Sequence, residues 1–158
     1  MNEQVRYMIL AAQRQGNRIL EERFRQIGLT SSQAEVLSLL DKYEPLSLKE
    51  LGAMLVCESG SPSRLVNAIV KAGLIERKPD SRDGRVRLLQ LTEEGRNKLP
   101  KLQAIEDELY GYLDRTWPQE EKRQMIELLQ RFLKDLPIAK ALKRRALWEG
   151  NNEKKSDH

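Results

Sequence analysis

The 158-residue sequence has few of the residues on which enzymes and secreted proteins depend. It contains one cysteine, so an intrachain disulfide is excluded and a reducing compartment is the expected environment. Its one histidine, His158, argues against a Ser-His-Asp or Cys-His arrangement and against a multi-histidine zinc site. The sequence shows no glycine-rich phosphate loop. We therefore expect no enzyme activity, no catalytic residue, no metal site and no cofactor.

Long apolar runs and aromatic residues are also scarce. No stretch approaches the ~20 apolar residues of a membrane span, and the first residues contain no signal-peptide core. The expected location is the cytoplasm, without membrane contact. Aromatic residues make up 5% of the chain and charged residues 33%, which favours a helical protein with leucine-rich stripes. The net charge of +4 is compatible with a polyanionic partner but does not require one.

Residues 48–92 organise the rest of the chain. Ser47 and Glu50 have the spacing of a capping box, and apolar residues at helical spacing follow them. A second helix is predicted to begin near residues 59–61, after a short turn, and to end at Gly73, which can adopt the left-handed capping conformation. Two helices that meet at a short turn form a helix-turn-helix, an arrangement that reads DNA.

A basic hairpin is predicted directly after the second helix. A short strand begins at Leu74, residues 77–87 form a loop, and residues 86–91 return as a strand. The loop carries the basic residues Arg77, Lys78, Arg82, Arg85 and Arg87 against two acidic ones, Asp80 and Asp83. Leu46-Ser47 can add a short edge strand. The expected fold class is mainly α with a small β-hairpin wing.

The flanks of this unit are predicted to be helical. Residues 2–27 show one long apolar periodicity, and further capping signals stand at Thr30, Thr92 and Thr116. Pro100 is expected to bend the helix that follows Thr92, and a short last helix is expected over residues 138–148. The two ends are predicted to pack together, so that the winged helix-turn-helix is inserted between dimerisation helices. The predicted division is a helical dimerisation region over 1–28 and 93–148, a DNA-binding domain over 29–92, and a disordered tail over 149–158.

These motifs resemble the MarR family of multiple-antibiotic-resistance regulators. The resemblance rests on Leu29-Thr30 with Gln33, Val36-Leu37 and Leu40, on Leu51 and Leu55, on Ser63-Arg64-Leu65-Val66-Asn67, on Gly73-Leu74-Ile75-Glu76-Arg77, on the pattern of Asp80, Asp83 and Arg85, and on Leu91-Thr92-Glu93-Glu94-Gly95. Val56 stands where the family often has a glycine, which predicts either a differently shaped turn or a longer preceding helix. Gly60, Ser61 and Pro62 stand where the family more usually has polar residues, in the first turn of the second helix. This departure bears on which side chains touch the bases.

The resemblance implies a bacterial, homodimeric regulator that binds a pseudo-palindromic operator in double-stranded DNA, with repression as the expected mode. The DNA-binding candidates are Ser59, Ser61, Ser63, Arg64, Asn67 and Lys71 on the second helix, and Arg82, Arg85 and Arg87 in the hairpin. Arg64 can read guanine and Asn67 adenine. Alternatively, Arg64 contacts a phosphate or an internal carboxylate, Asn67 faces solvent, and the hairpin arginines form an ordinary charged loop. Asp83 is expected to shape the wing by pairing with a nearby arginine.

The resemblance also implies release by a small aromatic or phenolic effector in a cleft between the dimerisation helices and the winged helix. Met8, Ala12 and Arg14 are candidates to line that cleft, with ordinary core or surface roles as the alternative. Cys57 is expected to be a buried small hydrophobe. The other interpretation of Cys57 is a thiol that senses oxidants, next to the second helix, which is the recognition helix of the expected helix-turn-helix. A further alternative function is a winged-helix protein-interaction module that does not bind DNA.

Overall fold

A computed structural model describes residues 1–57 and 60–148 of the chain. Its helices are α1 (Asn2–Gln26), α2 (Ser31–Tyr43), α3 (Leu48–Gly52), α4 (Pro62–Lys71), α5 (Glu93–Thr116), α6 (Gln119–Leu133) and α7 (Ile138–Arg144), and its strands are β1 (Leu46–Ser47), β2 (Ile75–Pro79) and β3 (Arg87–Leu91). The expected fold class, mainly α with a small β-hairpin wing, is confirmed. The tail predicted over 149–158 lies outside the described residues.

The capping signals explain where several helices begin and end. Thr30 and Ser47 each form the predicted capping box, with Gln33 and Glu50 respectively. Gly28 and Gly73 both adopt a positive φ, as their positions after apolar helices predict. The predicted box at Thr116 is wrong. Thr116 belongs to α5, where its hydroxyl donates to the carbonyl of Tyr112 at 2.8 Å, because that acceptor lies one turn back in the same helix.

The three strands form an antiparallel sheet in the order β1-β3-β2. Leu46 of the edge strand lies opposite Leu89, and Ile75 lies opposite Leu91. The predicted edge strand is therefore confirmed. The hairpin loop is shorter than predicted, because β2 continues to Pro79 and β3 begins at Arg87, so that only residues 80–86 form the connection.

One hydrophobic core joins the sheet to α2, α3 and α4. Its fully buried large side chains are Val36, Leu37, Leu40, Leu51, Val66, Ile69, Ile75, Leu89 and Leu102. Gly95 fixes α5 against this unit: a Cβ there would lie 2.1 Å from the carbonyl oxygen of Leu74, an oxygen that accepts the backbone N–H of Thr92. Because Gly95 has no side chain, the first turn of α5 can lie this close to the backbone at Leu74.

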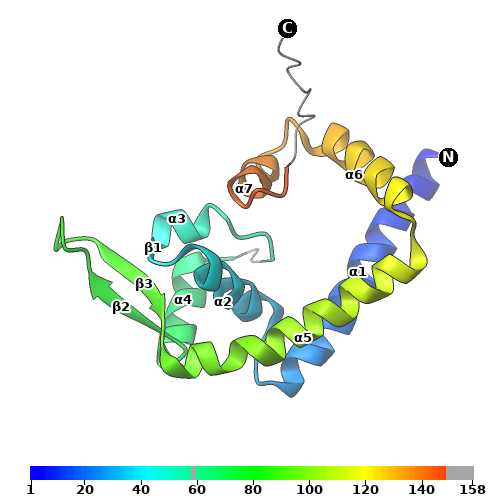
Figure 1. The fold of residues 1–158 in the computed structure, drawn as a ribbon. Helices are drawn as coiled ribbons and strands as arrows, with labels where there is room; N and C mark the ends of the chain where they lie inside the picture. The colour runs from blue at the N-terminus through cyan, green and yellow to red at the C-terminus, as the bar shows by residue number, and fades with distance from the viewer. Residues whose placement is uncertain (58–59, 149–158) are drawn as a thin grey trace, which may run out of the picture.

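The helices from the two ends lie around this unit, as Figure 1 shows. α1 packs against α2 and α5, and an ion pair joins Arg23 of α1 to Glu108 of α5 at 2.7 Å. α5 continues through Pro100 and curves along its length in Figure 1, in agreement with the predicted bend. α6 has no buried residue. α7 returns toward α3, so the last helix lies against the unit formed by α2, α3, α4 and the sheet rather than along α1.

None of the helices in the described part of the chain is long and apolar enough to span a membrane.

Candidate nucleic-acid interface

Helix α4 is held firmly at both ends. Ser61 is its N-cap, and the Ser61 hydroxyl accepts the backbone N–H of Arg64 at 3.4 Å. Pro62 occupies the first turn, where its missing N–H leaves no hydrogen bond unmade. At the other end, the N–H of Leu74 bonds to the carbonyl of Ile69 at 3.2 Å, and Gly73 takes the left-handed conformation between them. α4 therefore presents a defined N-terminal end.

The exposed face of α4 carries four of the predicted DNA-binding residues. They are Ser63, Arg64, Asn67 and Lys71, which are all exposed and recur at the three- and four-residue spacing of one helix face. Val66 and Ile69 fill the opposite, buried face. Among the described residues, the side chains of Arg64 and Lys71 have neither a hydrogen bond nor an ion pair, which leaves both cations free for a ligand. Ser59, also predicted, lies outside the described residues.

Asn67 has a partner that the sequence interpretation missed. Arg77, on β2, donates from Nη2 to Oδ1 of Asn67 at 2.5 Å. A bidentate contact to adenine uses both the oxygen and the nitrogen of an Asn amide. The Asn67 oxygen has a second lone pair, so Arg77 restrains the orientation of the amide without occupying its whole acceptor capacity. The only sequence signal for Arg77 is its basic charge near the exit of α4. Its position beside Asn67 depends on how the sheet packs against the helix.

Two aspartates shape the hairpin turn by accepting backbone N–H groups. Asp83 accepts the N–H of Arg85 at 3.0 Å, and Asp80 accepts the N–H of Arg82 at 2.9 Å. The prediction that Asp83 pairs with an arginine side chain is wrong. Among the described residues, the ion pair in this turn joins Arg82 to Asp80 at 3.6 Å. Asp83 instead bonds to the backbone two residues ahead, as aspartates in turns commonly do.

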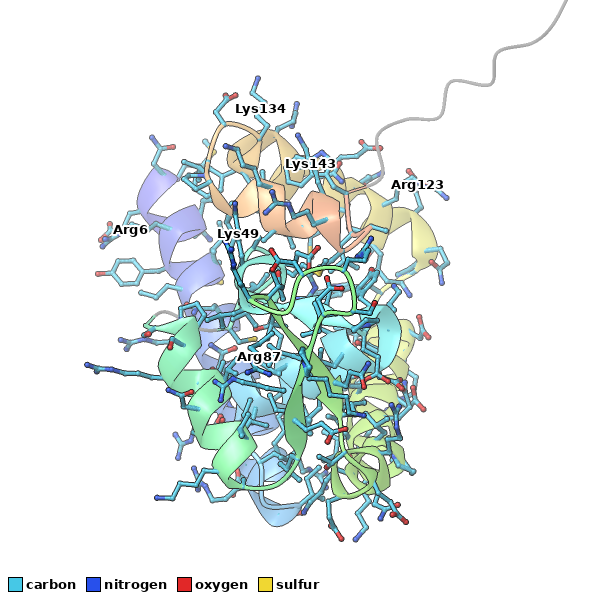
Figure 2. The ribbon with its side chains drawn as sticks, turned by 90° about the vertical axis from the view of Figure 1, so that its left-hand side faces the viewer. Arg6, Lys49, Arg87, Arg123, Lys134 and Lys143 are labelled. Atoms are coloured by element: carbon cyan, nitrogen blue, oxygen red, sulfur yellow. The ribbon has the colours of Figure 1, made fainter. Side chains whose placement is uncertain are left out.

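The hairpin cations Arg85 and Arg87 are exposed, and no ion pair joins either side chain to a described residue. Figure 2 views the molecule from the side on which the hairpin projects, and Arg87 lies there beside the strands. α4 and β2 are in contact, and the Arg77–Asn67 hydrogen bond connects helix and sheet directly. The helix cations and the hairpin cations thus belong to one packed unit, as a surface that binds a polyanion requires.

Cys57 lies in the turn between α3 and α4. The expectation that Cys57 is buried is wrong: α3 ends at Gly52, and the side chain of residue 57, beyond that end, is exposed. The alternative of a longer preceding helix is excluded for the same reason. The pKa of the Cys57 thiol is nevertheless raised to about 11, first by its partial removal from water and then by the carboxylate of Glu35. A thiol with so high a pKa carries little thiolate, the form that oxidants attack.

We therefore expect Cys57 to react slowly near neutral pH. With a pKa of about 11, about one thiol in a thousand is ionised at pH 8, and the rate of reaction with a chromogenic disulfide reagent should rise steeply from there toward pH 11. The same chain unfolded in urea should react about tenfold faster at pH 8.

If DNA binding is lost on treatment with peroxide in both the native protein and a Cys57→Ser variant, the thiol is not a sensor. Rapid reaction of the folded protein at pH 7 contradicts this expectation.

A cavity of about 470 Å³ lies between α2, α5 and the residues at the end of α7. Tyr43, Glu106, Tyr110 and Arg145 are among its lining residues. Burial raises the pKa of Glu106, and its neighbour Ser38 donates to it at 3.4 Å. The first-helix candidates Met8, Ala12 and Arg14 are exposed and do not line this cavity.

The arrangement defines a class of protein. A helix-turn-helix with an adjoining antiparallel hairpin, both bearing exposed cations on one unit, is a winged helix-turn-helix. Among the described residues, no group of acidic, histidine or cysteine side chains could hold a metal ion.

Comparison with known proteins gives the family. The MarR family profile matches residues 29–86. The HTH-type transcriptional regulator YxaD of Bacillus subtilis is 34% identical over 99 residues, which are 63% of this chain and 69% of that protein. In the complex of Staphylococcus aureus MepR with DNA, the protein superposes with a TM-score of 0.75 at 22% identity, over 84% of this chain and 97% of that chain. A mutant of Escherichia coli MarR, in complex with operator DNA, superposes with a TM-score of 0.70 at 23% identity, over 80% of this chain and 91% of that chain. The chain belongs to the MarR family, and it is a DNA-binding transcriptional regulator.

Proposed function

We propose that the chain acts as a homodimeric repressor on a pseudo-palindromic operator. α4 of each protomer enters one of two successive major grooves, about 34 Å apart on one face of the duplex. The observation that carries the proposal is the set of exposed cations without an ion pair to any described residue, Arg64 and Lys71 on α4 with Arg85 and Arg87 on the hairpin. Their guanidinium and ammonium groups are available to phosphate and base edges.

The residues divide by role. Arg64 reads guanine through two parallel hydrogen bonds, and Asn67 reads adenine while Arg77 holds its amide in place. The hydroxyl groups of Ser61 and Ser63, with Ser59 before them in the sequence, donate hydrogen bonds to phosphates of the DNA backbone at the positive end of α4. Lys71 and Arg82 contact phosphates, while Arg85 and Arg87 follow the minor groove or its edge. Asp83 keeps the turn between these arginines in shape.

The dimer is proposed from the exposed apolar faces of the end helices. α6 buries none of its residues in the protomer, although Met125, Ile126, Leu128, Leu129 and Phe132 form a stripe along it. α1 exposes Val5, Met8 and Ile9 in the same way. Such faces mark a protein interface, and a second copy of residues 1–28 and 93–148 can cover them. This assigns those two segments to dimerisation and residues 29–92 to DNA binding.

The cavity between α2 and α5 supports the proposed effector site. Its volume of about 470 Å³ lies within the range of small-molecule sites. Tyr43 and Tyr110 offer aromatic contacts to a phenolic ligand, and Arg145 offers a cation. α2 belongs to the winged helix and α5 to the proposed dimerisation region, so a ligand between them can favour a spacing of the two α4 helices that no longer matches the groove.

The direct test is binding to the DNA upstream of the protein's own gene, measured by fluorescence anisotropy. A fragment with an inverted repeat should bind more tightly than a scrambled fragment of equal length. If Arg85 and Arg87 of both protomers each neutralise one phosphate, the logarithm of affinity should fall with the logarithm of salt with a slope of about −3.6 or steeper. Absence of binding to either fragment at low salt would favour the protein-interaction module instead.

A further inference from the structure

Glu35 of α2 is the one charged side chain among the buried residues that the structure describes, with 7% of its surface exposed. Its carboxylate holds the turn between α3 and α4. Oε1 accepts the backbone N–H of Val56 and Oε2 accepts the N–H of Cys57, both at 2.8 Å. A buried carboxylate that accepts two successive N–H groups fixes the path of the chain at residues 56 and 57, a few residues before α4 begins.

The counter-charge of Glu35 comes from the far end of the sequence. Arg145, 110 residues away and directly after α7, donates from Nη1 to Oε1 of Glu35. The exposed fraction of the side chain is 21% for Arg145 and 4% for Glu35. Ala139 and Ala141 of α7 are buried, which seats the helix from which Arg145 projects. The docking of α7 therefore decides whether the buried carboxylate has an ion-pair partner.

A buried carboxylate without its partner is strongly unfavourable, and two hydrogen bonds from neutral N–H groups do not offset the loss of a cation. The Glu35 side chain would then turn toward water, and the N–H groups of Val56 and Cys57 would lose their acceptor. The start of α4 follows this turn within a few residues, with Ser61 as its N-cap. The turn, and with it the N-terminal end of α4, would lose its fixed geometry.

We infer that Arg145 is a positioning residue for DNA binding, which holds the N-terminal end of α4 in its DNA-competent geometry through Glu35. Undocking of α7 then weakens DNA binding although Arg145 itself contacts no DNA. The inference rests on the proposed DNA contact of α4. It gives α7 a role that none of the sequence motifs predicts, and it connects the cavity lined by Arg145 to the recognition helix.

The first experiment compares Arg145→Met with Arg144→Met. Arg144 is the exposed neighbour and has no ion pair within the described chain, so both variants lose one charge from the same helix end. At a temperature where circular dichroism shows both folded, Arg145→Met should bind the operator about tenfold more weakly, with the same salt slope as the parent. Arg144→Met should bind normally. Equal affinity of the two variants, or a salt slope reduced by about one per protomer, overturns the inference.

Two further variants test whether Arg145 acts through Glu35. Arg145→Lys keeps the charge and should restore most of the affinity. In a Glu35→Gln background there is no buried charge to satisfy, so adding Arg145→Met should change affinity less than about twofold. A full tenfold effect of Arg145→Met in that background would show that the arginine works by another route and would overturn the inference.

Cys57 supplies a readout that does not depend on DNA. It is the only cysteine in the sequence. Partial burial raises the pKa of its thiol most, the Glu35 carboxylate raises it further, and Arg145 lowers it. If the turn kept its shape, Arg145→Met would slow the reaction of the thiol. If the turn opens, as inferred, Glu35 moves away and the thiol should react several-fold faster at pH 8. A slower or unchanged thiol reaction in Arg145→Met overturns the inference, whether or not an operator is bound. If the parent protein does not bind DNA at all, that result counts against the proposed function alone.

Discussion

Replacing Arg64 and Arg85 together by alanine should abolish specific binding to the operator. The double variant loses two cations per protomer and four per dimer. A bidentate arginine–guanine contact contributes about 1–3 kcal/mol of discrimination, and two such contacts per dimer give a loss on the order of a hundredfold or more before the phosphate contacts of Arg85 are counted. Both side chains are exposed and have no ion pair with a described residue, so the fold should be unaffected. Anisotropy titration at fixed salt measures the loss.

The matched control is Lys101→Ala with Arg144→Ala, which removes the same charge from exposed positions outside α4 and the hairpin. The single variants separate the roles. Arg64→Ala should relax the base preference at one position of each half-site, whereas Arg85→Ala should weaken binding evenly across sequences and lower the salt slope by about 0.9 per protomer. Unchanged affinity in the double variant would end the proposed mode of DNA binding.

A charged substitution on the exposed face of α6 should convert the protein to a monomer. Leu128 and Phe132 are 57% and 65% exposed in the protomer and lie one turn apart on the apolar stripe. Glutamate at both positions would place two carboxylates in the proposed interface, where charge is strongly unfavourable. Sedimentation velocity should show a single species of protomer mass. Since each half-site would then be bound separately, operator affinity should fall by about a hundredfold or more.

Lys134→Glu is the control for this variant. It makes the same change of two charges per protomer, but Lys134, the C-cap of α6, is exposed and lies away from the apolar stripe, on the polar side of the helix. It should leave the protein dimeric and able to bind the operator. A parent protein that sediments as a stable protomer, or a Leu128→Glu, Phe132→Glu variant that remains a dimer, would contradict the proposed interface.

The predictions that succeeded rest on residues close together in the sequence. Thr30 with Gln33 and Ser47 with Glu50 are three residues apart, and both pairs form their boxes. Gly73 adopts its positive φ because the chain must turn out of α4 there. The failures have the opposite character. Thr116 has a capping pattern, but the preceding helix continues through it. The apolar character of Cys57 does not decide its burial, and the residue is exposed.

The candidate interface shows the same division. The exposed positions of Arg64 and Lys71 follow from helical periodicity once the buried face with Val66 and Ile69 is known. The Asn67–Arg77 contact depends on how the sheet packs against α4, and no spacing in the sequence predicts it. The hairpin arginines could be named from the sequence, but the pairing of Arg82 with Asp80 depends on the geometry of the turn.

The sequence by itself determined the family, the helix-turn-helix with its wing, and the cation-bearing face of α4, because periodicity, capping and turn chemistry act over a few residues. Only the tertiary structure decided that α7 packs beside the DNA-reading unit and that Arg145 meets the buried Glu35 across 110 residues of chain. The physical reason is that a buried charge takes its partner from whichever element packs against it, and that choice is made by the whole core rather than by neighbours in the sequence.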